Sequence, residues 1–124
     1  MILVADDDAA VRRLIVAVLE KSGYATTQAA NDKEAVEAYS SQQSAIDLVL
    51  TDVDMPVMNG LDALRRMRAL NPTLATIVIT GAARDTAWPP EIGRYWMPKP
   101  LIPRKLLELI RLLLSGPQVT GSPA

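Results

Sequence analysis

Three short runs of this chain are apolar at every position, and this feature limits the fold more than any other. The runs are residues 2–5 (ILVA), 48–50 (LVL) and 77–79 (IVI). A strand with one face in water alternates apolar and polar residues, whereas a continuously apolar strand must be covered on both faces. Apolar residues recur at helical spacing between these runs. The pattern predicts an α/β fold, with a parallel sheet between two layers of helices.

The rest of the chain continues this alternation, which repeats about five times. Strands are predicted at residues 2–5, 24–28, 45–51, 75–80 and 94–97, and helical stripes at 11–19, 35–39, 61–70 and 106–114. Asp8 is predicted to cap the first helix, and Asn31 or Asp32 the second. Trp88-Pro89-Pro90 interrupts residues 81–93, so a fourth helix there should be short or irregular. We expect one domain over residues 1–115 and a disordered tail at 116–124.

The composition excludes several kinds of chemistry. The 124 residues include no cysteine and no histidine, which removes disulfides, imidazole bases and Cys- or His-ligated metals. A formal net charge of -1 gives no basic excess for binding nucleic acid. The longest apolar run, residues 14–19, is far shorter than the roughly 18 residues of a membrane span, and the start of the chain lacks the features of a secretory signal. We therefore expect a cytoplasmic protein that uses carboxylates, hydroxyls, lysine or arginine.

Five chemically active side chains directly follow predicted strands. They are Asp6, Asp7, Asp52, Thr80 and Lys99. The carboxyl ends of parallel strands lie at one edge of the sheet, where ligands of open α/β sheets bind. Three carboxylates placed together repel one another unless a cation lies among them, and oxygen ligands without His or Cys favour a hard ion such as Mg²⁺. The sequence therefore predicts a Mg²⁺ site in which the ion and Lys99 balance three negative charges.

A carboxylate beside a metal ion and a lysine can attack a phosphoryl donor and form an aspartyl phosphate. We predict that Asp52 is this nucleophile. Each residue has an ordinary alternative when taken alone: Asp6 and Asp7 could belong to a solvated acidic loop, Thr80 could simply end a strand, and Lys99 could be a surface lysine. The five positions together favour the chemical interpretation.

Four fragments carry a resemblance to a known family. They are LVADD at residues 3–7, LVLTDVDMPVMNG at 48–60, IVITG at 77–81 and the Lys99-Pro100 pair. In this order and spacing they resemble the receiver domain of bacterial two-component response regulators, of the chemotaxis-regulator type, over about residues 1–115. The resemblance implies a flavodoxin-like fold with a five-stranded parallel sheet of order 2-1-3-4-5.

The resemblance also implies the reaction and its metal ligands. Asp52 would receive a phosphoryl group from a histidine kinase or a histidine phosphotransfer protein. Because this sequence has no histidine, the phosphorylated histidine would belong to another protein or to a segment outside this sequence. Mg²⁺ would be bound by Asp7, Asp52 and the backbone carbonyl of Asp54, with Asp6 acting through water. The Asp54 side chain would border the phosphoryl group, so the lifetime of the phosphorylated state does not carry over from relatives.

The switch residues follow from the same resemblance. Thr80 and Lys99 would hold the phosphoryl group, and the Lys99-Pro100 peptide bond would be cis. Trp96 stands where the family usually has a Tyr or Phe that swings inward on activation, although packing at the sheet edge is an equal alternative. Pro98 removes a strand N–H, which is tolerated on an edge strand. The output would pass to a downstream protein that the sequence does not identify.

Two other functions remain open at this point. Asp52-Val53-Asp54 resembles the DxD pair of haloacid-dehalogenase-like phosphatases. In that family the pair follows the first strand of a larger chain with a cap, whereas here it follows the third strand, and Pro56 replaces the usual Thr or Val. An unphosphorylated interaction module on the receiver fold is the other alternative, and the complete set of five residues argues against it.

Overall fold

A computed structural model describes residues 1–52, 60–80 and 95–121, except the side chains of residues 60, 61 and 115–121. Its centre is a five-stranded sheet of order β2-β1-β3-β4-β5, in which all neighbouring strands are parallel. The strands are β1 (Ile2–Ala5), β2 (Thr26–Ala29), β3 (Leu48–Asp52), β4 (Ala75–Thr80) and β5 (Trp96–Pro98). The predicted fold class and strand order are confirmed.

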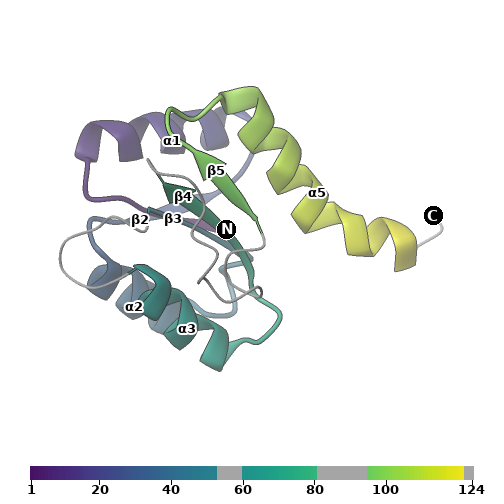
Figure 1. Cartoon of the computed structure of the whole chain (residues 1–124). Helices are drawn as coiled ribbons and strands as arrows, with labels where there is room; N and C mark the ends of the chain where they lie inside the picture. Colours follow the sequence, from purple (N-terminus) through teal and green to yellow (C-terminus); the bar gives the residue numbers. More distant parts are fainter. Residues whose placement is uncertain (53–59, 81–94, 122–124) are drawn as a thin grey trace.

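Two layers of helices cover the sheet (Figure 1). The described helices are α1 (Ala9–Lys21), α2 (Asp32–Ser41), α3 (Gly60–Leu70) and α5 (Pro103–Gly121). Helices α1 and α5 lie on one face of the sheet, and α2 and α3 lie on the other. The predicted short or irregular fourth helix falls on residues 81–94, outside the described residues. Among the described helices, none has the length and apolar character needed to cross a membrane.

The continuous apolar runs are explained by a separate core on each face. Successive strand residues point to opposite faces, so Val49 packs toward α2 and α3 while Leu48 and Leu50 pack toward α1 and α5. All three side chains are fully buried. Tyr39 and Leu64 complete the first core. Burial on both faces is the property that the sequence predicts for these strands.

Side-chain caps start two helices next to the carboxyl edge of the sheet. The Asp8 carboxylate accepts hydrogen bonds from the backbone N–H of Ala10 at 2.9 Å and of Val11 at 3.2 Å, which confirms the predicted cap of α1. Asn31 caps α2 by accepting from the N–H of Glu34 at 2.8 Å. The cap at Asp8 fixes the start of α1 at Ala9, two residues after Asp7.

Some element boundaries differ from the predicted ones. β2 begins at Thr26 instead of residue 24, and β5 spans Trp96–Pro98 instead of 94–97. α5 continues to Gly121, past the predicted end near residue 115, and Figure 1 shows its last turns extending away from the sheet. An existing helix is extended more easily than a new one is started, so composition is a weak guide to where it ends. The division of the chain at residue 115 stays a prediction.

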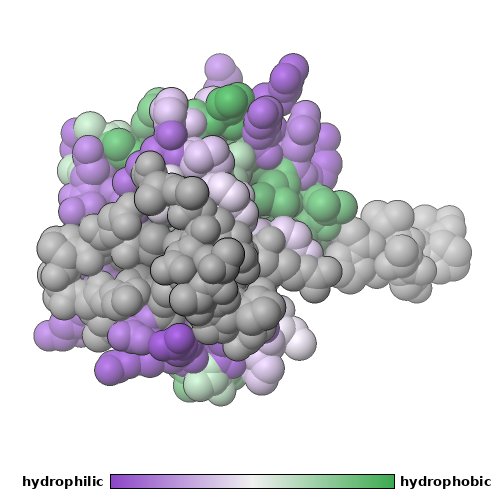
Figure 2. All heavy atoms as spheres, in the orientation of Figure 1, coloured by the Kyte–Doolittle hydropathy of each residue, from purple (hydrophilic) through white to green (hydrophobic). Residues whose placement is uncertain are grey.

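The beginning of α5 carries apolar surface as well as core contacts. Leu106 and Ile110 are buried against the sheet, whereas Leu112 is 61% exposed. Figure 2 shows apolar side chains gathered over this part of the molecule. The helix therefore has an apolar face that the described residues only partly cover.

Candidate functional site

The register of the central strands brings three carboxylates together. Ala5 of β1 is paired with Thr51 of β3, so the next residue on each strand, Asp6 and Asp52, also lies side by side. Carboxylate oxygens of Asp6, Asp7 and Asp52 all lie within 4.8 Å of one another. Asp6 and Asp52 are buried and Asp7 is exposed. The site is therefore an acidic cluster with two buried carboxylates, and solvent reaches it at Asp7.

A lysine from the edge strand neutralises part of this charge. Lys99 Nζ lies 2.5 Å from Asp52 Oδ2, and the exposed fractions of the two side chains are 37% and 2%. The backbone N–H of Lys99 donates to the carbonyl oxygen of Thr80 at 3.0 Å, which ties this residue to the end of β4. Thr80 is itself buried at that end. The ammonium group is thus fixed at the carboxyl edge by its backbone as well as by its ion pair.

Hydrogen bonds hold the turn that carries Asp6 and Asp7. The backbone N–H of Asp6 donates to the carbonyl oxygen of Ala29 at 3.1 Å, and Asp6 Oδ1 accepts from the N–H of Asp8 at 2.9 Å. Asp6 Oδ2 is buried, and no described residue donates to it. Buried carboxylate oxygens are normally hydrogen-bonded or bound to a cation. This oxygen and its two carboxylate neighbours therefore fit a hard cation.

The surroundings of Asp6 disfavour its charge. Burial is the largest effect and raises the pKa of Asp6 above the ordinary value of 3.8. The hydrogen bond from the Asp8 N–H lowers this pKa, the nearby Asp52 carboxylate raises it, and the positive charge of Lys99 lowers it. In the absence of a cation, the charged form of Asp6 is thus costly in the folded state. A bound cation would reverse this effect by stabilising the carboxylate.

Replacement of Asp6 by Asn should stabilise the protein when no metal is present. We expect Asp6→Asn to raise the free energy of unfolding at neutral pH by about 1 kcal/mol, because it removes a buried charge whose Oδ2 accepts no hydrogen bond from the described residues. The folded protein binds the Asp6 proton more tightly than the unfolded chain, so the contribution of Asp6 to stability should fall as the pH rises from 3.8 through the raised pKa, and the advantage of Asp6→Asn should grow over that range. Urea unfolding in EDTA across this range measures both effects.

The matched control is Asp62→Asn, which removes an exposed carboxylate that contacts only Arg65 within the described α3. This control should change stability little, since exposed ion pairs contribute about 0–1 kcal/mol. Saturating Mg²⁺ should reduce or reverse the advantage of Asp6→Asn. If Asp6→Asn were less stable than wild type in EDTA at neutral pH, the charged Asp6 carboxylate would not destabilise the metal-free protein, and this prediction would be wrong.

The structure brings five of the predicted site residues together at one edge of the sheet. Asp6, Asp7, Asp52, Thr80 and Lys99 lie at the carboxyl edge of the sheet, and the Lys99–Pro100 bond is cis, as predicted. Asp54 lies outside the described residues.

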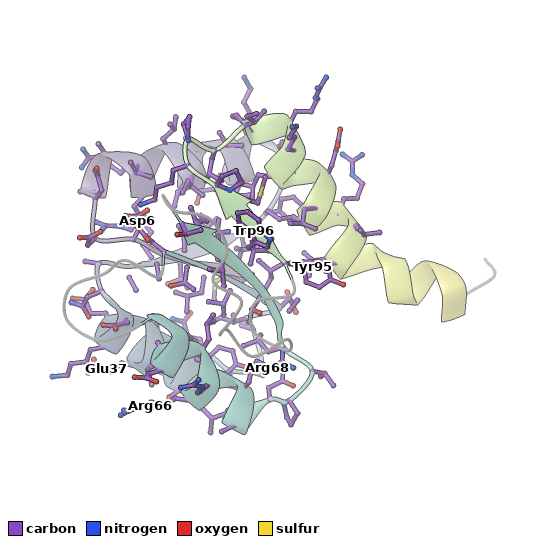
Figure 3. All side chains as sticks on the ribbon, viewed as in Figure 1. Asp6, Glu37, Arg66, Arg68, Tyr95 and Trp96 are labelled. Carbon is purple, nitrogen blue, oxygen red and sulfur yellow. The ribbon has the colours of Figure 1, made fainter. Side chains whose placement is uncertain are left out.

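Trp96 is half-buried and packs against the core beneath α2 and α3. Figure 3 shows it on β5, next to Tyr95. This contact agrees with packing at the sheet edge, and the switch role of Trp96 stays a prediction.

One residue beside the site was missed by the sequence analysis. Arg12 Nη1 donates to the backbone carbonyl oxygen of Asp6 at 2.7 Å, and Arg12 Nε donates to Gln28 Oε1 at 3.1 Å. On a helix of this pattern, an arginine between apolar positions is normally a solvent-facing residue. The available signal was its position one helical turn after the cap Asp8.

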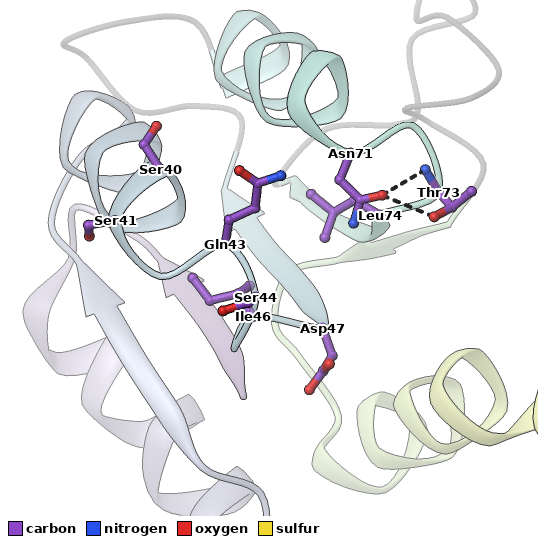
Figure 4. Close-up of a pocket in the computed structure, with 9 residues that line it drawn as sticks. All are labelled: Ser40, Ser41, Gln43, Ser44, Ile46, Asp47, Asn71, Thr73 and Leu74. Atoms are coloured by element: carbon purple, nitrogen blue, oxygen red, sulfur yellow. Dashed lines mark hydrogen bonds between the residues drawn. The ribbon is translucent and has the colours of Figure 1, made fainter.

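A groove of about 780 Å³ lies at the other edge of the sheet, away from the carboxylates (Figure 4). It lies between the ends of α2 and α3. Gln43 donates to the carbonyl oxygen of Leu70 at 3.1 Å, and Asn71 accepts from the N–H and hydroxyl of Thr73 at 3.2 and 3.0 Å. These polar groups pair with one another and join two loops. In spite of its size, this groove is therefore not the candidate functional site, which is the carboxylate cluster at the carboxyl edge of the sheet.

Comparison with known proteins identifies the family. The family model described as "Response regulator receiver domain" matches residues 2–111. The response regulator receiver protein CpdR of Brucella abortus is 42% identical over 82 residues, which cover 66% of this chain and 67% of CpdR. The chain therefore belongs to the response regulator receiver domain family. It is a signalling domain of two-component systems, and this family favours phosphoacceptor chemistry over the phosphatase alternative.

Solved structures agree with this family. A CheY-like receiver domain protein of Methanospirillum hungatei has a TM-score of 0.86 at 29% identity, with 96% of both chains covered. The response regulator TrrA of Thermotoga maritima, solved in complex with Mg(2+)-BeF, has a TM-score of 0.82 at 28% identity, with 91% of this chain and 97% of TrrA covered. The chain matches only 10% of the length of the LuxN sensor kinase of Vibrio campbellii and 12% of the sensor kinase CckA of Brucella abortus.

Proposed function

We propose that this receiver domain takes a phosphoryl group onto Asp52 in a Mg²⁺-dependent reaction. One observation carries the proposal: the buried Asp52 carboxylate lies beside two further carboxylates and an ammonium group. Asp6 and Asp7 supply the carboxylates, and Lys99 Nζ lies 2.5 Å from Asp52 Oδ2. A structural ion pair needs no further carboxylates around it, whereas phosphoryl transfer needs a nucleophile, a metal ion and a cation at the same point.

The proposed metal ligands are the carboxylates of Asp7 and Asp52 and the backbone carbonyl of Asp54, with Asp6 acting through a water molecule. The all-oxygen donor set and the unpartnered Asp6 Oδ2 support a hard cation, and the Mg(2+)-BeF complex of TrrA supports Mg²⁺ in a relative. Asp54 lies outside the described residues and enters by resemblance alone. When bound, Mg²⁺ supplies positive charge that offsets the negative charge of the phosphoryl oxygens.

The residues of the chain have distinct proposed roles in the transfer. An Asp52 carboxylate oxygen forms a bond to phosphorus while the bond from phosphorus to the donor histidine nitrogen breaks, and that nitrogen keeps the electron pair. Lys99 already lies at Asp52 and can bind a phosphoryl oxygen, and Thr80 at the end of β4 can donate its hydroxyl. Loss of the phosphoryl group to water completes the cycle, so the domain would catalyse its own phosphorylation and dephosphorylation.

The proposed partners are a histidine kinase or a histidine phosphotransfer protein as donor and a downstream protein as receiver of the signal. The sensor kinases LuxN and CckA among the relatives support a kinase as the donor. A conformational change would pass from Asp52 through Thr80 and Lys99 to Trp96 on β5. We place the domain in the cytoplasm, which agrees with a chain that contains no cysteine.

Phosphorylation by a small donor tests this function directly. Incubation of the protein with acetyl phosphate and Mg²⁺ should add one phosphoryl group by mass spectrometry, and peptide mapping should place it on Asp52. EDTA should prevent the reaction. A protein that gains no phosphoryl group with Mg²⁺ would instead be an unphosphorylated interaction module, and steady turnover of a small phosphate ester would indicate a phosphatase.

A further inference from the structure

We propose that Arg12 is a positioning residue for the metal site: it holds the peptide group that carries Asp7 and thereby sets the direction of that carboxylate. This inference rests on the proposed function, because it concerns the affinity of the same site for Mg²⁺. Arg12 lies in α1 and contacts the acidic turn only through backbone.

The contacts of Arg12 join three segments of the chain. Its Nη1 donates to the Asp6 carbonyl oxygen at 2.7 Å, and its Nε donates to Gln28 Oε1 at 3.1 Å. Its own backbone N–H donates to the Asp8 carbonyl oxygen at 2.9 Å, in the first turn of α1. The guanidinium group is planar and presents its N–H groups in a fixed fork. One side chain therefore ties the acidic turn to α1 and to β2.

The peptide plane explains how this contact reaches the metal site. The Asp6 carbonyl and the Asp7 N–H belong to one planar peptide group. A hydrogen bond that holds the carbonyl oxygen therefore also fixes the position of the Asp7 backbone N and Cα, from which the Asp7 side chain extends. Asp6 is held by its own hydrogen bonds to Ala29 and Asp8 and by burial. Asp7 is exposed, so packing does not fix its side chain. The hydrogen bond from Arg12 is thus the constraint that bears most directly on Asp7.

The sign of the effect separates positioning from simple electrostatics. Arg12 carries a positive charge near a predicted cation site, and like charges repel. If charge were its main effect, its removal would strengthen the binding of Mg²⁺. If Arg12 positions Asp7, its removal weakens binding, because ligands are left free to move and must be ordered when the ion binds.

Titration of the metal-free protein with Mg²⁺ alone, followed by calorimetry, tests the inference. We expect Arg12→Ala to weaken binding by about ten-fold, the lower end of the range for residues that orient metal ligands. Arg12→Lys should restore part of the loss, since an ammonium can donate to the Asp6 carbonyl but lacks the planar fork that also reaches Gln28. Gln28→Ala should weaken binding less than Arg12→Ala does.

The matched control is Arg13→Ala, which removes the same charge from the next residue of α1, an exposed position. It should leave the Mg²⁺ affinity unchanged or slightly higher. Equal effects of Arg12→Ala and Arg13→Ala, or tighter binding by Arg12→Ala, would overturn the positioning role. Circular dichroism in EDTA monitors the fold; should Arg12→Ala fail to fold, the order of affinities among wild type, Arg12→Lys and Gln28→Ala decides.

Two outcomes distinguish this inference from the proposed function. If the wild-type protein bound no Mg²⁺, both the proposed function and the role of Arg12 would be wrong. Loss of binding in Asp7→Asn together with unchanged binding in Arg12→Ala would keep the proposed metal site and remove only the role of Arg12. Phosphorylation supplies a further readout: Arg12→Ala should regain the wild-type rate at saturating Mg²⁺, because its defect lies in metal affinity.

Discussion

Asp52→Asn should lose phosphorylation by acetyl phosphate by about 10³-fold or more, because an amide oxygen is a far weaker nucleophile than a carboxylate. The fold should remain, since the amide has nearly the same shape and removes one charge from a buried acidic cluster. Lys99 loses its ion pair with the Asp52 carboxylate, but its side chain is 37% exposed and can be solvated. Mass spectrometry measures the transferred phosphoryl group, and circular dichroism measures the fold.

Asp62→Asn is the control that matches this change in charge, because Asp62 is exposed on α3, where it pairs with Arg65 at the surface. It should be phosphorylated as wild type is. Beryllofluoride, a mimic of the phosphoryl group, should bind to wild type only with Mg²⁺ and should not bind to Asp52→Asn. Full phosphorylation of Asp52→Asn would show that another residue is the acceptor, with Asp6 and Asp7 the first to test.

The sheet could be predicted well because its central strands are buried on both faces. Leu48, Val49 and Leu50 supply apolar side chains to two separate cores, and the sequence shows this as an unbroken apolar run. β2 is an edge strand with half-buried Thr26 and Thr27, so its sequence carries a weaker signal and its start was placed two residues early. The end of α5 was also misplaced, because Gly and Pro indicate a helix end only statistically.

The acidic site could be predicted because topology alone places its residues. Parallel strands end at one edge, so Asp6 and Asp52 had to become neighbours once the strand order was known. Arg12 could not be separated from Arg13 in the same way. Both are arginines on the polar side of one helix, and only the position of the Asp6 carbonyl oxygen in space distinguishes them. Contacts from a side chain to the backbone of another segment leave no specific pattern in a single sequence, and the position of Arg12 one helical turn after Asp8 was only a weak signal.

The burial of Asp6 was likewise outside the reach of sequence patterns. Asp6 and Asp7 are identical residues next to each other, yet Asp6 is buried and Asp7 is exposed. The difference arises because Asp6 extends β1 by one residue and its N–H donates to the Ala29 carbonyl oxygen on the neighbouring strand β2, whereas Asp7 lies in the turn before α1. Burial raises the pKa of Asp6 and makes its charge costly, whereas the Asp7 side chain is open to solvent. This difference in environment agrees with the separate roles proposed for the two carboxylates.

Lys99→Ala should separate phosphorylation from the conformational response. The variant should still accept a phosphoryl group from acetyl phosphate, because Asp52 and the metal ligands are retained. A hydrogen bond to a charged group contributes about 1.5–3 kcal/mol. Its loss should lower the population of the switched state about ten-fold to hundred-fold. Amide NMR spectra of β4 and β5, recorded with and without beryllofluoride and Mg²⁺, measure the response.

The reason lies in the connections of Lys99 within the sheet. In the unphosphorylated protein its ammonium is paired with Asp52 on β3, while its backbone N–H is bound to Thr80 on β4. Transfer of the ammonium from the carboxylate to a phosphoryl oxygen would move the end of β5 relative to β4. Lys105→Ala, an exposed lysine in α5, is the matched control and should respond as wild type does. Phosphorylated Lys99→Ala with the same amide shifts as phosphorylated wild type would show that the signal leaves Asp52 by another route, with the Thr80 hydroxyl as the next candidate.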